Sequence, residues 1–231
     1  MSLENSFFSK ETVDSLIKFC CSHYDQVVVM LPDGPAYHTY RAFGFDEIKS
    51  RAKAHRHGNN LRNKVAASLG GLSAAARKRV LCPRWATDVD VCLEYQAQLT
   101  RIRALHSCEG SAFSEQVHAA SAQVVGRESN PRHIDTALGA ECLLQELAFL
   151  DALDAILNSG ALKGYEPPES FVSVFVYHKP WPVFDFFRMN CASDSSTDGS
   201  SCGSCKLSME VVTAEMLRHH SLSTVPTAAA E

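Results

Sequence analysis

Four side chains are of types that do covalent or acid–base chemistry. Ser2 lies in a short polar stretch directly before a predicted helix, and its hydroxyl is the candidate nucleophile. Glu146 is a carboxylate within an apolar stretch, where it is either on the exposed seam of a helix or a buried functional acid. Tyr177 and His178 follow a buried strand, where α/β folds place site residues, although an ordinary aromatic strand end has the same pattern.

The cysteines form no recognisable metal or disulfide framework. Nine are scattered along the chain, and Cys202 and Cys205 make a single CxxC with no second pair to complete four zinc ligands. We therefore expect reduced thiols, as in a cytoplasmic protein, and neither a metal nor another cofactor.

Size and composition are those of one globular domain. The 231 residues are 45% hydrophobic and 21% charged, which is ordinary for such a domain. No apolar run approaches about 18 residues, and the N-terminus has no basic segment before an apolar one. We therefore expect no membrane partner and no secretion.

Charge is unevenly distributed along the chain. The net charge is −4, but the window from Ile48 to Thr87 contains no Asp or Glu and carries +10, which leaves −14 for the rest. A positive block on an acidic protein indicates a polyanion that docks on one face.

The basic residues of this window follow a helical repeat. One stripe runs at i, i+4, i+7, i+11 and i+15, and a second lies beside it; the stripes comprise Lys49, Lys53, Arg56, Asn60 and Lys64, and Arg51, His55 and Arg62. A solvated helix face is the ordinary meaning of such a run. Because no acid within the window can form i,i+4 pairs, we favour binding to a phosphate backbone, and no DNA partner is expected.

The elements that would position these residues alternate in type. A helix starts at Ser9, which can cap it, and residues 26–31 form a β-branched run typical of a buried parallel strand. A turn at residues 32–34 and a helix from Pro35 follow. Helix, strand, turn and helix form a unit of a doubly wound sheet, which would place Asp33 at the carboxyl end of the strand.

Further helices and strands are expected along the rest of the chain. Helices are predicted at 45–69 with a possible interruption at Gly58, from Thr87–Asp88 to Leu105, at 114–125 and at 130–157, and strands at 79–82 and 171–177. The predicted fold is a Rossmann-like parallel sheet flanked by helices. We divide the chain into a catalytic domain at 1–190, a flexible loop at 191–206, a last strand and helix at 207–220, and a disordered tail at 221–231.

Several of these pieces, in this order, resemble the cyclodipeptide synthases. Residues 2–8 are similar to the family motif Ser-x-x-Asn-Ser-aromatic-Phe, and residues 27–40 to its second strand and the helix start after it. Residues 58–64 resemble its basic helix. Glu146 matches the acid on its long helix, and Tyr177–His178 matches its Tyr-His pair.

The resemblance implies a fold like the catalytic domain of class I tyrosyl- and tryptophanyl-tRNA synthetases. It implies an enzyme that takes two aminoacyl-tRNAs and releases a cyclic dipeptide without ATP. Ser2 would carry the first aminoacyl group, Glu146 and Tyr177 would hold its amino group, and Asn5 with His178 would place the chain in the Asn-Tyr-His subfamily. The implied substrate-binding residues are Cys142, Met30, Asp33 and Tyr95, and the implied tRNA-binding residues are Lys49, Lys53, Arg56, Arg62 and Lys64.

Three features depart from the family pattern. Cys142 replaces the tyrosine that usually precedes the glutamate by four residues, and Ala148 replaces the proline usual after it. Family members also have a strand before the serine, so we expect the sequence to be N-terminally truncated.

Other functions fit parts of the pattern. A non-catalytic tRNA- or RNA-binding relative would keep the basic helix and lose the pocket. An ATP-using class I synthetase is suggested by His55–Asn59, which resembles a His-x-Gly-His element, but no Lys-Met-Ser-Lys-Ser-like loop accompanies it. A serine hydrolase is disfavoured because the chain has no Gly-x-Ser-x-Gly elbow.

Overall fold

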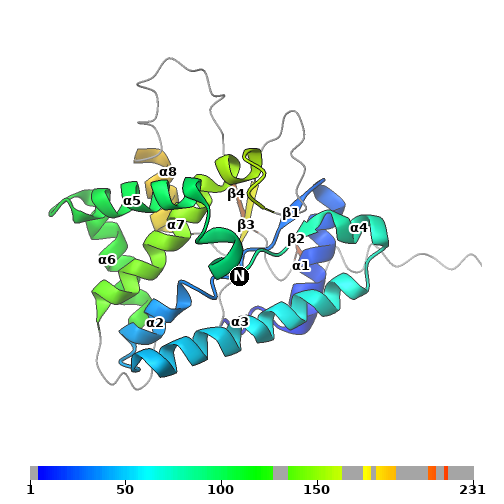
Figure 1. Cartoon of the computed structure of the whole chain (residues 1–231), viewed down its shortest axis with the longest axis horizontal. Helices are drawn as coiled ribbons and strands as arrows, with labels where there is room; N and C mark the ends of the chain where they lie inside the picture. The colour runs from blue at the N-terminus through cyan, green and yellow to red at the C-terminus, as the bar shows by residue number, and fades with distance from the viewer. Residues whose placement is uncertain are drawn as a thin grey trace, which may run out of the picture.

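The structure, a computed structural model, describes residues 5–126, 135–162, 174–177, 181–190, 208–211 and 216–217. These residues form a helix-rich α/β fold with parallel strand pairs (Figure 1). No helix among them is long and apolar enough to span a membrane. The predicted loop at 191–206 and tail at 221–231 lie outside the described residues.

The first strand pair lies beside the N-terminal helix. Helix α1 (Lys10–His23) starts as predicted, with the Ser9 hydroxyl accepting from the amide of Thr12. Strand β1 (Val27–Val28) pairs in parallel with β2 (Val80–Leu81), in the register Val27 to Val80. Both strands are shorter than predicted, although the amide of Val29 still donates to the Leu81 carbonyl at 2.8 Å.

Three helices connect β1 to β2: α2 (Ala36–Ala42), α3 (Glu47–Gly70) and α4 (Ala74–Lys78). Asp46 caps α3 by accepting from the amide of Lys49. The predicted interruption at Gly58 is wrong, because α3 continues through it. A Cβ at Gly58 would lie 2.5 Å from the Cβ of Asp33, so this glycine lets the loop after β1 pack directly on the helix.

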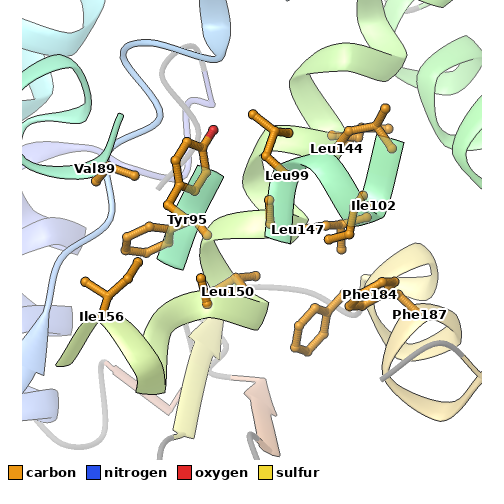
Figure 2. Close-up of a cluster of buried hydrophobic side chains, with 14 of the residues drawn as sticks. Val89, Tyr95, Leu99, Ile102, Leu144, Leu147, Leu150, Ile156, Phe184 and Phe187 are labelled. Atoms are coloured by element: carbon orange, nitrogen blue, oxygen red, sulfur yellow. The ribbon is translucent and has the colours of Figure 1, made fainter. Parts of the chain in front are cut away.

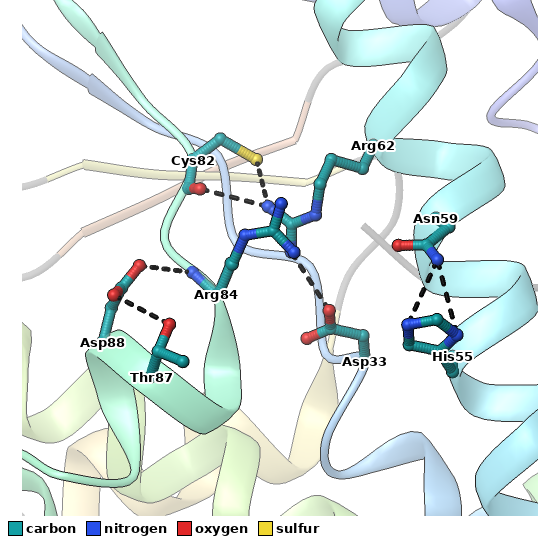
Figure 3. A network of polar contacts seen from close by, with 8 residues as sticks. All are labelled: Asp33, His55, Asn59, Arg62, Cys82, Arg84, Thr87 and Asp88. Atoms are coloured by element: carbon teal, nitrogen blue, oxygen red, sulfur yellow. Dashed lines mark hydrogen bonds and ion pairs between the residues drawn. The ribbon is translucent and has the colours of Figure 1, made fainter.

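The segment after β2 differs from the prediction. A π-helical turn, η1 (Trp85–Val89), precedes α5 (Leu93–Ser107), so the helix does not start at Thr87–Asp88. Asp88 lies inside this turn and is not the cap residue of α5, which is Cys92. The Asp88 carboxylate accepts from the Arg84 amide at 2.8 Å and from the Thr87 hydroxyl at 2.9 Å (Figure 3).

The other half of the fold is helical and centres on α7 (Thr136–Asn158), which packs against α2, α5 and α6 (Ala112–Val125). The helix predicted from Asn130 begins at Thr136, because Asp135 accepts from the amides of Ala137 and Leu138. Leu147 and Ile156 of α7 are fully buried together with residues of α5 and of α8 (Pro182–Asn190) (Figure 2). Helix α8 was not predicted from the sequence.

A second parallel pair completes the described strands. Strand β3 (Val174–Tyr177) pairs with β4 (Ser208–Val211), so Tyr177 lies opposite Val211. Both strands were predicted in part from the sequence. Val176 packs against the apolar cluster formed by α1, β1 and α3, which brings this pair next to the N-terminal half.

Candidate functional site

The segment before α1 is held in a fixed turn. The Asn5 side-chain oxygen accepts from the amide of Phe7 at 2.9 Å, and the Asn5 carbonyl accepts from Phe8 at 3.0 Å. This is the local turn that asparagine forms readily. Phe8 is buried and anchors the turn to the core. Ser2, three residues earlier, lies outside the described residues.

A lysine of the basic helix secures this segment. Lys64 Nζ donates to the Phe8 carbonyl at 2.7 Å. Lys64 was predicted to bind tRNA; its ammonium is half-buried and uses one of its three donors inside the protein. The contact joins the segment that follows the candidate nucleophile to α3.

Glu146 lies on α7, the central helix. It is half-buried, and loss of hydration raises its pKa to about 7. Two other acids of α7 pair with arginines of α5: Asp151 with Arg101 at 2.8 Å, and Glu141 with Arg103. Glu146 forms no ion pair or hydrogen bond with any residue that the structure describes. Its environment is therefore not that of an exposed helix seam.

The predicted pocket residues occupy different environments. Cys142 is buried one helical turn before Glu146, and burial together with the Glu146 charge raises the pKa of its thiol. Met30 is half-buried against the helical core. Tyr95 is 0% exposed and packs edge-on against Trp85, with ring centroids 5.7 Å apart. In this structure Tyr95 is a core residue, so it does not line an open pocket.

Asp33 and Arg62 form an ion pair where the first strand pair ends. Arg62 Nη2 lies 3.0 Å from Asp33 Oδ2, while Nη1 donates to the Cys82 carbonyl at 3.1 Å (Figure 3). Their side chains are only 15% and 21% exposed. Arg62 was predicted in the exposed stripe that meets tRNA. Instead it points into the protein, where it ties α3 to the ends of β1 and β2.

The rest of the basic helix is more exposed, but it is not free of acids. Lys49 pairs with Asp46 at 2.9 Å and Arg51 with Glu47 at 3.0 Å, because two acids stand just before the acid-free window. Lys53 is half-buried, with its ammonium 4.4 Å from the centre of the Phe45 ring. Arg56 is exposed.

A polar network between α2, α5 and α7 was not predicted. Gln145 Nε2 lies 2.8 Å from Glu141 Oε1 and 3.0 Å from His38 Nε2. Arg103 holds the same Glu141 carboxylate. Burial lowers the pKa of His38. The i,i+4 spacing of Glu141 and Gln145 was a sequence signal for one polar face on α7.

The remaining site predictions are only partly within the described residues. Tyr177 ends β3, as predicted, and His178 lies outside the described residues. Among the described residues, no group of three or more His, Cys, Asp or Glu side chains is placed to hold a metal ion. The structure thus places Glu146 and Cys142 together, and it leaves their approach to Ser2 and His178 as a prediction.

Comparison with known proteins gives one family. The family model described as cyclodipeptide synthase matches residues 1–193. Among curated proteins, none matches this sequence significantly.

Solved structures of cyclodipeptide synthases have the same fold. The chain is similar to AlbC of Streptomyces noursei, with 19% identity over 95% of this chain and 96% of that one and a TM-score of 0.64. It is also similar to the cyclodipeptide synthase of Staphylococcus haemolyticus, with 14% identity over 82% of this chain and 80% of that one and a TM-score of 0.59.

A Mycobacterium tuberculosis protein has 19% identity over 79% of this chain and 73% of that one, with a TM-score of 0.50. Its structure is described as demonstrating that cyclodipeptide synthetases are related to type I tRNA synthetases. The predicted Rossmann-like, synthetase-related fold class is therefore confirmed.

Proposed function

Since the chain belongs to the cyclodipeptide synthase family, we propose that it joins two aminoacyl groups, each delivered as an aminoacyl-tRNA, into a cyclic dipeptide. An aminoacyl-tRNA is already an activated ester, so the enzyme has to supply positioning and a covalent relay rather than ATP. The observation that carries the acid–base part of this proposal is Glu146, a half-buried carboxylate with a raised pKa and no partner among the described residues.

The reaction proceeds through two covalent intermediates on Ser2. Its hydroxyl attacks the first aminoacyl ester, and the tRNA leaves with its 3′-terminal hydroxyl protonated. The amino group of the aminoacyl-Ser2 then attacks the ester carbonyl of the second aminoacyl-tRNA. The ester bond breaks, the second tRNA leaves with its terminal hydroxyl protonated by the proton that the amine loses, and a dipeptidyl-Ser2 remains. Attack of the new terminal amino group on the Ser2 ester closes the ring and releases the Ser2 oxygen, which takes up a proton.

Glu146 manages the amino group that must attack. Ionised, it pairs with the α-ammonium of the first aminoacyl group. A carboxyl with a pKa of about 7 is also a competent base near neutral pH, so it favours loss of the proton as the amine attacks. Tyr177 shares this role and relays the proton during cyclisation. Cys142 leaves the amino-group pocket without the phenol that the family usually has there.

Five further residues shape the substrate sites. Asn5 supports the nucleophile segment through its turn, and His178 accompanies Tyr177, as in the Asn-Tyr-His subfamily. Met30 lies near the wall of the first amino-acid pocket. Asp33 is held by Arg62 and supports the loop after β1. Tyr95, which is fully buried, supports that pocket from behind.

The tRNA binds through its phosphates to the basic helix. Lys49, Arg51 and Arg56 are exposed on α3 within the acid-free window, and Lys53 lies on the same helix. Contacts to phosphates position a nucleic acid without reading its sequence. This suits an enzyme whose two substrates are tRNAs that carry different amino acids. The enzyme acts in the cytoplasm, where aminoacyl-tRNAs are made.

The test is to identify products and intermediates in cells that express the chain. Mass spectrometry of extracts is expected to show a new cyclic dipeptide with the unaltered chain and none with Ser2→Ala. The purified protein incubated with an aminoacyl-tRNA is expected to gain the mass of one aminoacyl group only when Ser2 is present. A product that persists in Ser2→Ala would refute the Ser2 route, and tRNA binding with no product from either chain would indicate a binding protein.

A further inference from the structure

A pocket of about 370 Å³ opens between the nucleophile segment and the basic helix. It is lined by Asn5 and Phe8 from the segment and by His57, Asn60, Leu61, Asn63 and Lys64 from α3. Pockets for small molecules span roughly 300 to 1,000 Å³, so this one suits a single compact group.

The lining has the chemistry of a nucleotide site. It contains three amides, an imidazole and an ammonium, and no acid. An amide side chain donates and accepts side by side, which matches the paired donor and acceptor on an adenine edge. Asn60 and Asn63 are exposed, and their side chains make no hydrogen bond to any residue within the described ranges. Both amides are therefore available to a ligand.

Positive charge lies where a phosphate would follow the base. Arg56, Asn60 and Asn63 are spaced i, i+4 and i+7 on α3, so they share one face of the helix. Arg56 is exposed, and Lys64 keeps two donors beyond its bond to Phe8. A nucleotide with its base on the amides thus has cations on either side for its phosphate.

The pocket wall also includes the segment that directly follows the candidate nucleophile. Asn5 lies in its wall, and Ser2 stands three residues earlier in the chain. Three residues of extended chain span at most about 10 Å. The Ser2 backbone therefore lies no farther than this from Asn5, a distance compatible with an ester held at the pocket.

We propose that this pocket binds the 3′-terminal adenosine of an aminoacyl-tRNA, with Asn60 and Asn63 on the base edge and Arg56 and Lys64 beside the phosphate. The inference rests on the proposed use of aminoacyl-tRNA. It adds a site for the nucleotide that carries the ester, and this site shares Arg56, Asn60 and Lys64 with the basic stripe. The terminal nucleotide would then set the position of the ester at the nucleophile segment.

The test compares binding of an intact tRNA with binding of the same tRNA lacking its terminal adenosine, at one salt concentration, by fluorescence anisotropy. The unaltered protein is expected to bind the intact tRNA roughly tenfold more tightly, the size of one bidentate base contact. Asn60→Ala/Asn63→Ala is expected to bind both tRNAs as the unaltered protein binds the shortened one.

The matched control is Asn59→Ala. Asn59 lies on the same helix but outside the pocket lining, where it contacts His55 (Figure 3). This variant is expected to keep the full discrimination, and circular dichroism of all three proteins confirms an unchanged helix content.

Equal affinity of the unaltered protein for the two tRNAs would overturn the adenosine site, as would discrimination that survives in the double variant. Competition by AMP without discrimination between the tRNAs would mark a site for free nucleotides and would also overturn it. Failure to bind either tRNA refutes the proposed function itself, so the two failures are distinguishable.

Discussion

At the scale of single residues, two neighbouring acids on α7 have opposite surroundings. Burial alone would raise the pKa of Glu141, but hydrogen bonds from Arg103 and Gln145 lower it. Glu146 has no such donor among the described residues, so burial raises its pKa from 4.5 to about 7. Folding therefore favours the protonated form of Glu146 and the ionised form of Glu141.

We predict that Glu146→Gln changes stability only at high pH. The native state binds more protons at Glu146 than the unfolded state between pH 4.5 and 7, so this residue makes stability fall as the pH rises through that window. Glutamine cannot ionise. The variant is expected to match the unaltered protein near pH 4 and to exceed it by on the order of 2 to 3 kcal/mol at pH 8, measured by urea unfolding at both values.

Glu141→Gln is the control with the opposite sign. Its carboxyl has a lowered pKa, so the stability it contributes is present above the unfolded value and is lost as the pH falls through the folded one. The Gln variant is expected to be less stable at pH 8. Equal gains from both substitutions would mean that removal of net charge, and not burial of Glu146, decides the result.

The surroundings of a predicted site residue could be inferred from the sequence where they depend on its own helix, but not where they depend on a distant neighbour. The apolar surroundings of Glu146 in the sequence gave two possible environments, and its burial favours one of them. Helical spacing placed Arg62 in a stripe next to Arg51, but it could not show that the loop after β1 brings Asp33 within 3.0 Å. Lys64 likewise meets Phe8, a residue 56 positions away in sequence.

At the scale of elements, capping residues and β-branched runs predicted most helices and strands, but their ends depended on the fold. Ser9 starts α1 as expected, because the cap is a local interaction. Strand β1 is shorter than its run, since a ladder needs a partner and β2 is equally short. The π-helical turn at Trp85–Val89 was not predicted. The Asp88 carboxylate accepts from the amide of Arg84, four residues earlier, and this contact has no simple sequence pattern.

Gly58 joins two of these elements, and we predict that Gly58→Ala destabilises the protein. Alanine favours a helix over glycine by about 1 kcal/mol. The new Cβ, however, would lie 2.5 Å from the Cβ of Asp33, and relieving that overlap costs about 1 to 3 kcal/mol and shifts the Asp33–Arg62 pair. The net effect is expected to be a lower urea midpoint.

Gly70→Ala provides the matched control on the same helix. No atom lies within 4 Å of a Cβ added at Gly70, so only the gain in helix propensity remains. Its midpoint is expected to stay equal or rise by the equivalent of about 0.5 to 1 kcal/mol. A Gly58→Ala variant that is as stable as Gly70→Ala would show that the loop after β1 can withdraw from α3 at no cost.

At the scale of the whole molecule, most of the acid-free window lies in one long helix and the short helix after it. Helix α3 runs the length of one side of the molecule beside α1 and α2, and α4 follows it (Figure 1). Arg77 and Lys78 on α4 are exposed, as are Lys49, Arg51 and Arg56 on α3. An acidic chain thus concentrates exposed cations along two consecutive helices, and this positive strip suits a polyanion.

This distribution predicts how tRNA binding responds to salt. Each phosphate that a cation neutralises adds about 1 to the slope of log affinity against log salt concentration. Lys49→Ala/Arg56→Ala is therefore expected to reduce that slope by about 2 while leaving a weaker, still salt-dependent complex. The affinity would be measured by anisotropy across a salt series with one uncharged tRNA.

Lys18→Ala is the control that distinguishes loss of phosphate contacts on α3 from a general loss of positive charge. Lys18 lies on α1 outside the acid-free window and pairs with Asp14 at 2.7 Å. If tRNA docks on the positive strip of α3 and α4, Lys18→Ala leaves the slope against salt concentration unchanged, because Lys18 would contact no phosphate. If tRNA binding depends only on net charge, Lys18→Ala reduces the slope by half as much as the double variant does. In that case the tRNA has no defined binding site on α3. Since a covalent relay needs the ester at one place, a chain without such a site could bind tRNA and still fail to close a dipeptide.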